Sequence, residues 1–181
     1  CPILRVAGAE RGCRRSGPRR RVLETVARRS DPEWVTTFSA AELTRVAEAE
    51  GMIFPDHVVD QLVSALEAGK HVILTGPPGT GKTTLAYLAA ELARHSMLCT
   101  GYQPTTATSE WTTFETIGGL QPTPEGLIFR PGLFVEAIDT GRWLVIDELN
   151  RSNFDRAFGQ LFTVLSGSAV VLPFRRSGQI K

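Results

Sequence analysis

The segment from Gly76 to Thr83 constrains the fold of this chain more than any other feature. It reads Gly-Pro-Pro-Gly-Thr-Gly-Lys-Thr and matches the pattern G-x-x-x-x-G-K-[ST]. A β-branched run, residues 71–75, comes directly before it, and a helical pattern over residues 82–95 follows. A glycine-rich loop between a buried strand and the start of a helix points several backbone N–H groups at one place, where they bind anionic oxygens. The sequence therefore predicts a phosphate-binding loop.

The positions of this loop have predicted roles in binding a nucleotide. The glycines let the backbone turn tightly, and Lys82 brings a cation to the β- and γ-phosphates. The Thr83 hydroxyl is expected to ligate Mg²⁺, and Thr84 is expected at the α-phosphate. The predicted nucleotide-binding residues are Gly76, Pro77, Pro78, Gly79, Thr80, Gly81, Lys82, Thr83 and Thr84.

A second motif, residues 143–148, reads Trp-Leu-Val-Ile-Asp-Glu. An apolar strand here delivers two adjacent carboxylates to its carboxyl end, the edge of an open parallel sheet at which ligands bind. We expect Asp147 to hold Mg²⁺ through water and Glu148 to orient and deprotonate the attacking water. With Lys82 they form the predicted catalytic set, and Thr83 and Asp147 the predicted metal site. Phosphoryl transfer needs mainly positioning and charge neutralisation, so this set suffices as the core of a hydrolytic site.

The remaining pattern predicts an α/β fold with three layers. Strands are expected over residues 71–75, 97–107, 143–146 and 169–174, with a turn or hairpin over 121–130. Helices are expected over 39–51, 55–68, 82–95, 131–140 and 153–166, with a short one within 110–120. Strands that alternate with helices imply a parallel sheet covered on both faces.

The N-terminal region differs in charge from the rest of the chain. Residues 1–30 hold nine arginines against Glu10 and Glu24, a local excess of +7. We expect a disordered basic tail over residues 1–30, followed by one nucleotide-binding domain over 31–181. The tail is either a nucleic-acid-binding arm or a solvated segment, and no aromatic residue interleaves with its first arginines to stack on bases.

The three cysteines form no CxxC pair and favour a reducing, cytoplasmic compartment. No apolar run approaches the ~18 residues that a membrane span needs, so we expect no membrane span. The chain begins with Cys1 rather than Met, and we expect it to be a fragment whose domain is incomplete at the C-terminus.

These two motifs together resemble those of the AAA+ ATPases. The stretch Leu-Val-Ile-Asp-Glu-Leu-Asn-Arg, residues 144–151, and the segment from Gly126 onward resemble the dynein-related and MoxR-like branch, which includes McrB-type GTPases. The resemblance implies a P-loop NTPase core that binds ATP with Mg²⁺ and hydrolyses it to remodel a protein or nucleic-acid partner. It also implies a homo-oligomer, often a hexameric ring, in which a neighbour's arginine completes the site.

The resemblance leaves several assignments open. A GTP-specific restriction subunit and a nucleotide-binding switch without turnover remain alternatives to an ATPase. Arg151 is a candidate for a subunit-contact or metal-side role, or forms a salt bridge at a helix start. Met52, Ile53 and Phe54 lie near the base or are core residues. The sensor residue, the arginine finger and the helical lid are expected beyond the end of this sequence.

Overall fold

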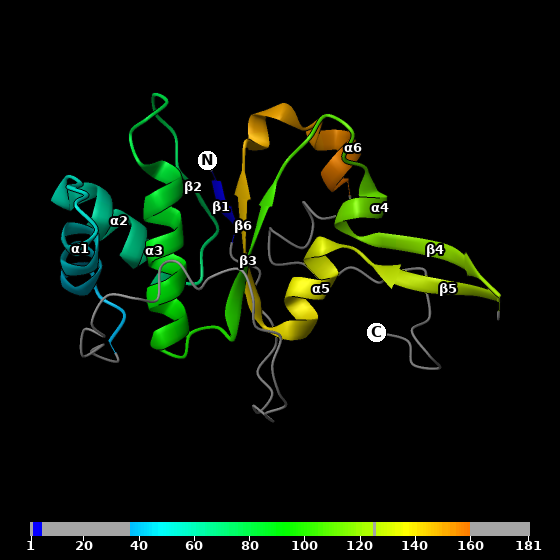
Figure 1. Ribbon diagram of the computed structural model, residues 1–181, viewed down its shortest axis with the longest axis horizontal. Coiled ribbons are helices and arrows are strands. Elements are labelled where there is room, and N and C mark those ends of the chain that lie inside the picture. The colour runs from blue at the N-terminus through cyan, green and yellow to red at the C-terminus, as the bar shows by residue number, and fades with distance from the viewer. Residues whose placement is uncertain (1, 5–36, 125, 160–181) are drawn as a thin grey trace.

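The computed structural model describes residues 2–4, 37–124 and 126–159 (Figure 1). Two helices, α1 (Ala40–Ala49) and α2 (Asp56–Glu67), precede the short strand β2 (Val72–Ile73) and the helix α3 (Lys82–His95). Then follow β3 (Gly101–Thr106), α4 (Thr113–Thr116), β4 (Gly118–Thr123), β5 (Gly126–Pro131) and α5 (Leu133–Thr140). The described chain ends with β6 (Arg142–Asp147), the 3₁₀ turn η1 (Leu149–Arg151) and α6 (Phe154–Phe158). None of the helices in these ranges is long and apolar enough to cross a membrane.

The central sheet has the strand order β2-β1-β6-β3, where β1 spans Pro2–Leu4. Strands β3 and β6 pair in parallel over their whole length, from Gly101 opposite Arg142 to Thr106 opposite Asp147. This confirms the predicted parallel pairing for these two strands. Strand β1 runs antiparallel to both neighbours, so the described sheet is mixed.

Strand β6 separates two hydrophobic cores because its side chains alternate between the faces of the sheet. Trp143 and Val145 pack with α1, α2 and α3 in one core. Leu144 and Ile146 pack with α5, Phe134 and Phe158 in the other. All four β6 side chains are at most 2% exposed. Figure 1 shows the resulting layers, with α1–α3 on one side of the sheet and α4–α6 on the other. The strand is as deeply buried as its apolar sequence predicts.

The segment between α4 and α5 forms a two-stranded hairpin of β4 and β5, which projects from the body of the protein in Figure 1. The prediction of a turn or hairpin over residues 121–130 is confirmed, although the strands begin earlier and end later. Pro131 ends β5 and does not begin the following helix, which starts at Leu133 with Gly132 as its N-cap.

Two predictions about the sheet differ from the structure. Residues 71–75 were expected as a buried strand, but β2 is two residues long and Ile73 is 61% exposed. The reason is that β2 lies at the edge of the sheet as the described residues form it, and it pairs with two residues of β1. Residues Pro2–Leu4, expected in a disordered tail, form β1 because their extended backbone pairs with both β2 and β6. Residues 5–36 and the predicted strand over 169–174 lie outside the described residues.

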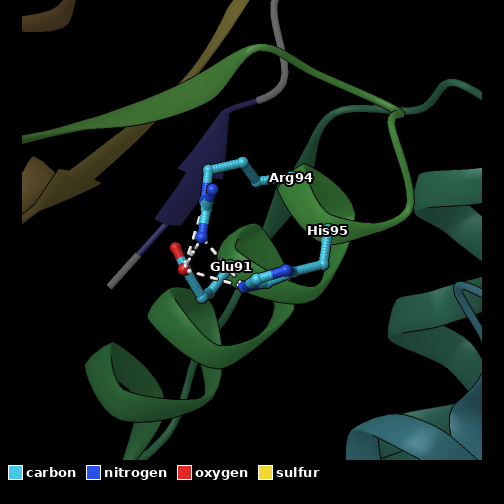
Figure 2. Close-up of polar contacts among 3 residues, drawn as sticks. All are labelled: Glu91, Arg94 and His95. Carbon is cyan, nitrogen blue, oxygen red and sulfur yellow. Dashed lines mark hydrogen bonds and ion pairs between the residues drawn. The ribbon is translucent and has the colours of Figure 1, made fainter. Parts of the chain in front are cut away.

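The C-terminal end of α3 carries a small ionic network (Figure 2). Arg94 and His95 both contact the Glu91 carboxylate, with His95 Nε2 3.3 Å from Glu91 Oε1. The hydrogen bond and charge of Glu91 raise the pKa of Arg94, against the opposing effect of burial. The helix then ends with Met97 in the left-handed region at φ 59°, where the N–H of Leu98 donates to the carbonyl of Ala93. Helices α1 and α2 end with the same bond pattern, but with Gly51 and Gly69 at this position.

Candidate functional site

The predicted phosphate loop leads directly into the N-terminus of α3. Gly76, Gly79 and Gly81 all have positive φ, at 144°, 79° and 76°, values that glycine adopts without the strain of a Cβ atom. Gly81 is the N-cap of α3, and no side chain caps that helix end. The unpaired N–H groups of the first helical turn and the helix dipole therefore favour an anion here. Residues 75–80 are exposed, so this end of the helix is open to a ligand from solvent.

The Lys82 ammonium lies inside the curve of this loop. Its Nζ donates to the carbonyl oxygens of Gly76 at 3.0 Å and Pro77 at 2.6 Å, and to Thr80 Oγ1 at 3.3 Å. Thr80 Oγ1 itself donates to the Pro77 carbonyl at 3.0 Å. The loop thus wraps around a positive charge, the arrangement that an anionic phosphate oxygen would enter. Of the other predicted nucleotide-binding residues, Pro78 lies in the loop and Thr84 lies on the first turn of α3.

The two motifs meet at a single side-chain contact. Thr83 Oγ1, on the first turn of α3, donates to Asp147 Oδ2 at the end of β6 over 3.1 Å. The other carboxylate oxygen, Oδ1, accepts from the backbone N–H of Glu148 at 2.7 Å. Both predicted metal ligands therefore lie together. Within the described ranges no three His, Cys, Asp or Glu side chains form a metal-binding group. The pair fits Mg²⁺, which takes oxygen ligands and keeps several of its waters.

The charge of Asp147 reaches a neighbouring aromatic residue. Burial and, secondarily, the Asp147 carboxylate raise the pKa of Tyr87, which lies one helical turn after Thr83 on α3. The Tyr87 ring stacks on Tyr102 of β3 with ring centroids 6.0 Å apart. The carboxylate thus lies at a partly buried boundary between α3 and the sheet, where charges are screened less than at the surface.

Glu148 has a backbone conformation that is rare for a residue with a side chain. Its φ of 54° and ψ of 35° place it in the left-handed region, which costs about 1–2 kcal/mol for an L-residue. The turn η1 follows directly, and it brings Arg151 back so that its Nε lies 3.2 Å from Glu148 Oε2. The sequence left two alternatives for Arg151, a subunit-contact or metal-side role and a salt bridge at a helix start. The structure contains a salt bridge, to Glu148. Its spacing of three residues is the signal from which it follows.

The segment before α2 contacts the far end of the phosphate loop. A Cβ atom built on Gly81 would lie 2.4 Å from Met52 Cε and 3.1 Å from the Phe54 ring. Ile53 between them is 90% exposed. The structure therefore brings this predicted base-side segment to the loop, and leaves an apolar side chain beside it in solvent. Among the other aromatic residues, Trp111 is buried, whereas Phe114 is 44% exposed.

A cavity of about 270 Å³ opens on the other side of the loop. It lies between β2, the phosphate loop and the turn that follows β6, and Gly76, Lys82 and Asn150 line it. The sequence leaves the role of Asn150 as open as that of Arg151, since its position after two carboxylates does not say which way the chain turns.

Comparison with known proteins gives a family match. A family model for AAA domains of the dynein-related subfamily matches residues 71–177, more than half of the chain. The chain is similar to Midasin of Giardia intestinalis, with 28% identity over 117 residues, 65% of this chain and 2% of that protein. It is similar to the Type IV methyl-directed restriction enzyme EcoKMcrB subunit of Escherichia coli, with 24% identity over 121 residues, 63% of this chain and 26% of that protein.

A shorter match joins the chain to the Holliday junction branch migration complex subunit RuvB of Thermotoga petrophila. The identity is 39% over 66 residues, 33% of this chain and 20% of that protein. The chain thus spans at most 26% of the length of these relatives.

Proposed function

The chain belongs to the dynein-related subfamily of AAA domains, and we propose that it binds ATP with Mg²⁺ and hydrolyses it. The observation that carries this proposal is the contact between Thr83 and Asp147, at 3.1 Å. It joins the phosphate loop to the end of β6, so that the ligands for phosphate, metal and water come from one edge of the sheet. Four residues carry the chemistry: Lys82, Thr83, Asp147 and Glu148.

Each of these side chains has one task in the proposed reaction. Lys82 neutralises the charge that develops on the transferred phosphoryl group. Thr83 and Asp147 hold Mg²⁺, which supplies charge stabilisation at the phosphate oxygens when it is bound. Glu148 orients a water and takes its proton as the water oxygen attacks the terminal phosphorus. The bond to the bridging oxygen breaks, and ADP and inorganic phosphate are released.

A substitution of Glu148 separates binding from hydrolysis. Glu148→Gln keeps the size of the side chain and removes the base, so we expect nucleotide binding to persist and turnover to fall by about 10²-fold or more. Nucleotide affinity is measured by calorimetry, and phosphate release by a steady-state assay. Asp155→Asn, an exposed carboxylate on α6, is the control and keeps normal turnover. Unchanged turnover in Glu148→Gln would remove Glu148 from its role, and binding without turnover in the unaltered protein would favour a nucleotide-binding switch.

The match to the restriction-enzyme subunit favours a second candidate, a GTP-specific subunit of a restriction complex. The two candidates share the phosphate and metal site and differ in the base. Competition between ATP and GTP for the same site separates them, because a GTP-specific protein would release labelled GTP only at a large excess of ATP.

We further propose that the protein acts as a homo-oligomeric ring that remodels a protein or nucleic-acid partner. The subfamily match supports this, since an arginine from a neighbouring copy would complete the site. Light scattering of the Glu148→Gln protein with and without ATP tests it. A mass that stays at one copy in both conditions would contradict the ring.

A further inference from the structure

The cavity beside the phosphate loop has one polar side chain from the turn that follows β6. Thr75, Gly76 and Lys82 contribute from the side of the loop, and Leu149 and Asn150 contribute from the turn η1. The volume of about 270 Å³ exceeds that of a phosphate group with several waters. Asn150 and Lys82 therefore line the same open space, one from the turn and one from the start of α3.

The turn after β6 places Asn150 apart from the ion pair of Glu148 and Arg151. Glu148, in the left-handed conformation, pairs with Arg151 at 3.2 Å, and neither of them lines the cavity. The positions i and i+3 of the turn thus share one side, and Asn150 lies on another. The polar residue of the turn that lines the cavity therefore carries an amide rather than a carboxylate.

The position of the cavity along the loop indicates which part of a nucleotide reaches it. Met52 and Phe54 contact the loop at Gly81, whereas the cavity opens at Gly76 and Lys82. Of the two alternatives for the segment of Met52 and Phe54, we infer the one that places the base on their side of the loop. The lysine of such a loop contacts the β- and γ-phosphates. The cavity therefore lies where the terminal phosphate emerges from the loop.

We propose that Asn150 donates a hydrogen bond from its side-chain amide to the terminal phosphate, and that the protein distinguishes a triphosphate from a diphosphate through this contact. The inference rests on the proposed function of the loop as a nucleotide site. An amide has two N–H donors, and phosphate oxygens accept them without a further charge being buried. A carboxylate at the same place would repel the phosphate. Because a diphosphate does not extend into the cavity, the contact acts on the triphosphate alone.

The test compares affinities for a non-hydrolysable triphosphate analogue and for ADP, both with Mg²⁺, by calorimetry. Asn150→Ala should weaken binding of the analogue about tenfold, the effect of losing a hydrogen bond to a charged group. Its affinity for ADP should change by less than about twofold. Asn150→Asp should weaken binding of the analogue further. Asn150→Ser provides a second variant without a charge. Thermal unfolding of each variant verifies its fold.

Two matched controls make the result specific. Asn153→Ala removes the same side chain from the N-cap of α6, outside the cavity, and should leave the ratio of the two affinities unchanged. Gln121→Ala removes an amide side chain from β4, outside the cavity, and should also leave the ratio unchanged. If Asn150→Ala and Asn150→Ser keep the ratio of the unaltered protein, the inference about Asn150 is wrong while the nucleotide site stands. If the unaltered protein binds neither ligand, the proposed function fails and this inference with it. If the unaltered protein binds both ligands but does not hydrolyse ATP, the comparison of affinities still tests the role of Asn150.

Discussion

Thr83 and Asp147 share a hydrogen bond of 3.1 Å although 64 positions separate them in the chain. Thr83 lies on the first turn of α3, and Asp147 ends the strand that divides the two cores. The contact fixes the helix N-terminus against the carboxyl end of β6. A phosphate held by the loop and a metal held by these two oxygens would therefore be neighbours.

The Thr83 hydroxyl should control the effect of Mg²⁺ on nucleotide binding. Thr83→Val keeps the shape of the side chain but removes the oxygen, so we expect the gain in ATP affinity from Mg²⁺ to fall by about tenfold. Calorimetric titrations with Mg²⁺ and with a chelator measure this gain. Thr83→Ser retains the hydroxyl and should behave like the unaltered protein. An equal Mg²⁺ effect in Thr83→Val and Thr83→Ser would exclude Thr83 as a ligand.

Met52 should contribute to the affinity for every nucleotide in the same proportion. Its side chain contacts the loop at Gly81, on the side proposed for the base, and apolar contact there is independent of the number of phosphates. Met52→Ala is expected to weaken the binding of ATP and the binding of ADP by about fivefold each, the effect of losing part of one apolar side chain. Leu127→Ala, at an exposed position on the hairpin, is the control. A loss confined to ATP would place Met52 at the phosphates instead.

The end of α3 should gain stability when Met97 is replaced by glycine. Met97 has φ 59° and is 82% exposed, so the left-handed backbone is strained and little packing is lost. Removing a strain of about 1–2 kcal/mol, less the greater chain entropy of glycine when unfolded, gives a net gain of about 0.5–1 kcal/mol.

Chemical denaturation of Met97→Gly measures this gain in the free energy of unfolding. The reverse substitution at the same position of α1, Gly51→Ala, should lower the free energy of unfolding by about 1 kcal/mol, since its φ is 73° and no atom lies within 4 Å of the added Cβ. A loss of stability in Met97→Gly would mean that the Met97 side chain makes a stabilising contact.

The cap of α4 should make stability depend on pH. Thr112 donates to Glu115 through its hydroxyl at 2.6 Å and its backbone N–H at 2.8 Å. These hydrogen bonds, with the hydroxyl first, hold the pKa of Glu115 below its usual value. A lowered folded-state pKa stabilises the protein above the unfolded pKa of about 4.3. That stabilisation is lost as the pH falls through the folded-state pKa.

Unfolding curves of Glu115→Gln measured from pH 6 to about pH 3 test the cap, because glutamine does not titrate. The variant should lose less stability over this range than the unaltered protein. Glu110→Gln, at an exposed neighbouring position, should keep the original pH dependence. Identical slopes in Glu115→Gln and the unaltered protein would contradict the assignment.

The features that follow from local sequence agree best with the structure. The four consecutive apolar residues before Asp147 predict a strand that is buried on both faces. Strand β6 is one, because it lies between two helical layers and neither of its faces meets solvent. Helix α3 has the predicted bounds, since the glycine before Lys82 and the polar end at His95 define both termini. The membership in the dynein-related subfamily is confirmed by the family match.

The features that depend on distant contacts could not be predicted. Ile73 is exposed because β2 is an edge strand among the described strands, where it pairs only with β1, and that pairing joins residues about 70 positions apart. The spacing of Glu148 and Arg151 indicates their ion pair, but no glycine or asparagine in the sequence marks the left-handed backbone at Glu148. The location of Asn150 in the cavity follows from the same turn. Local pattern thus predicts the elements and the motifs, whereas the orientation of the turn after β6 comes from the fold.

The most direct test of the account is a calorimetric titration of the protein and of Lys82→Ala with Mg²⁺-ATP and Mg²⁺-GTP. We expect the protein to bind ATP and Lys82→Ala to lose this affinity, because the ammonium that the loop holds at 2.6–3.3 Å is gone. Preference for GTP with the same loss would assign the site to the restriction-type candidate. Equal binding by Lys82→Ala and the unaltered protein, or binding by neither, would contradict the claim that this loop is a nucleotide site.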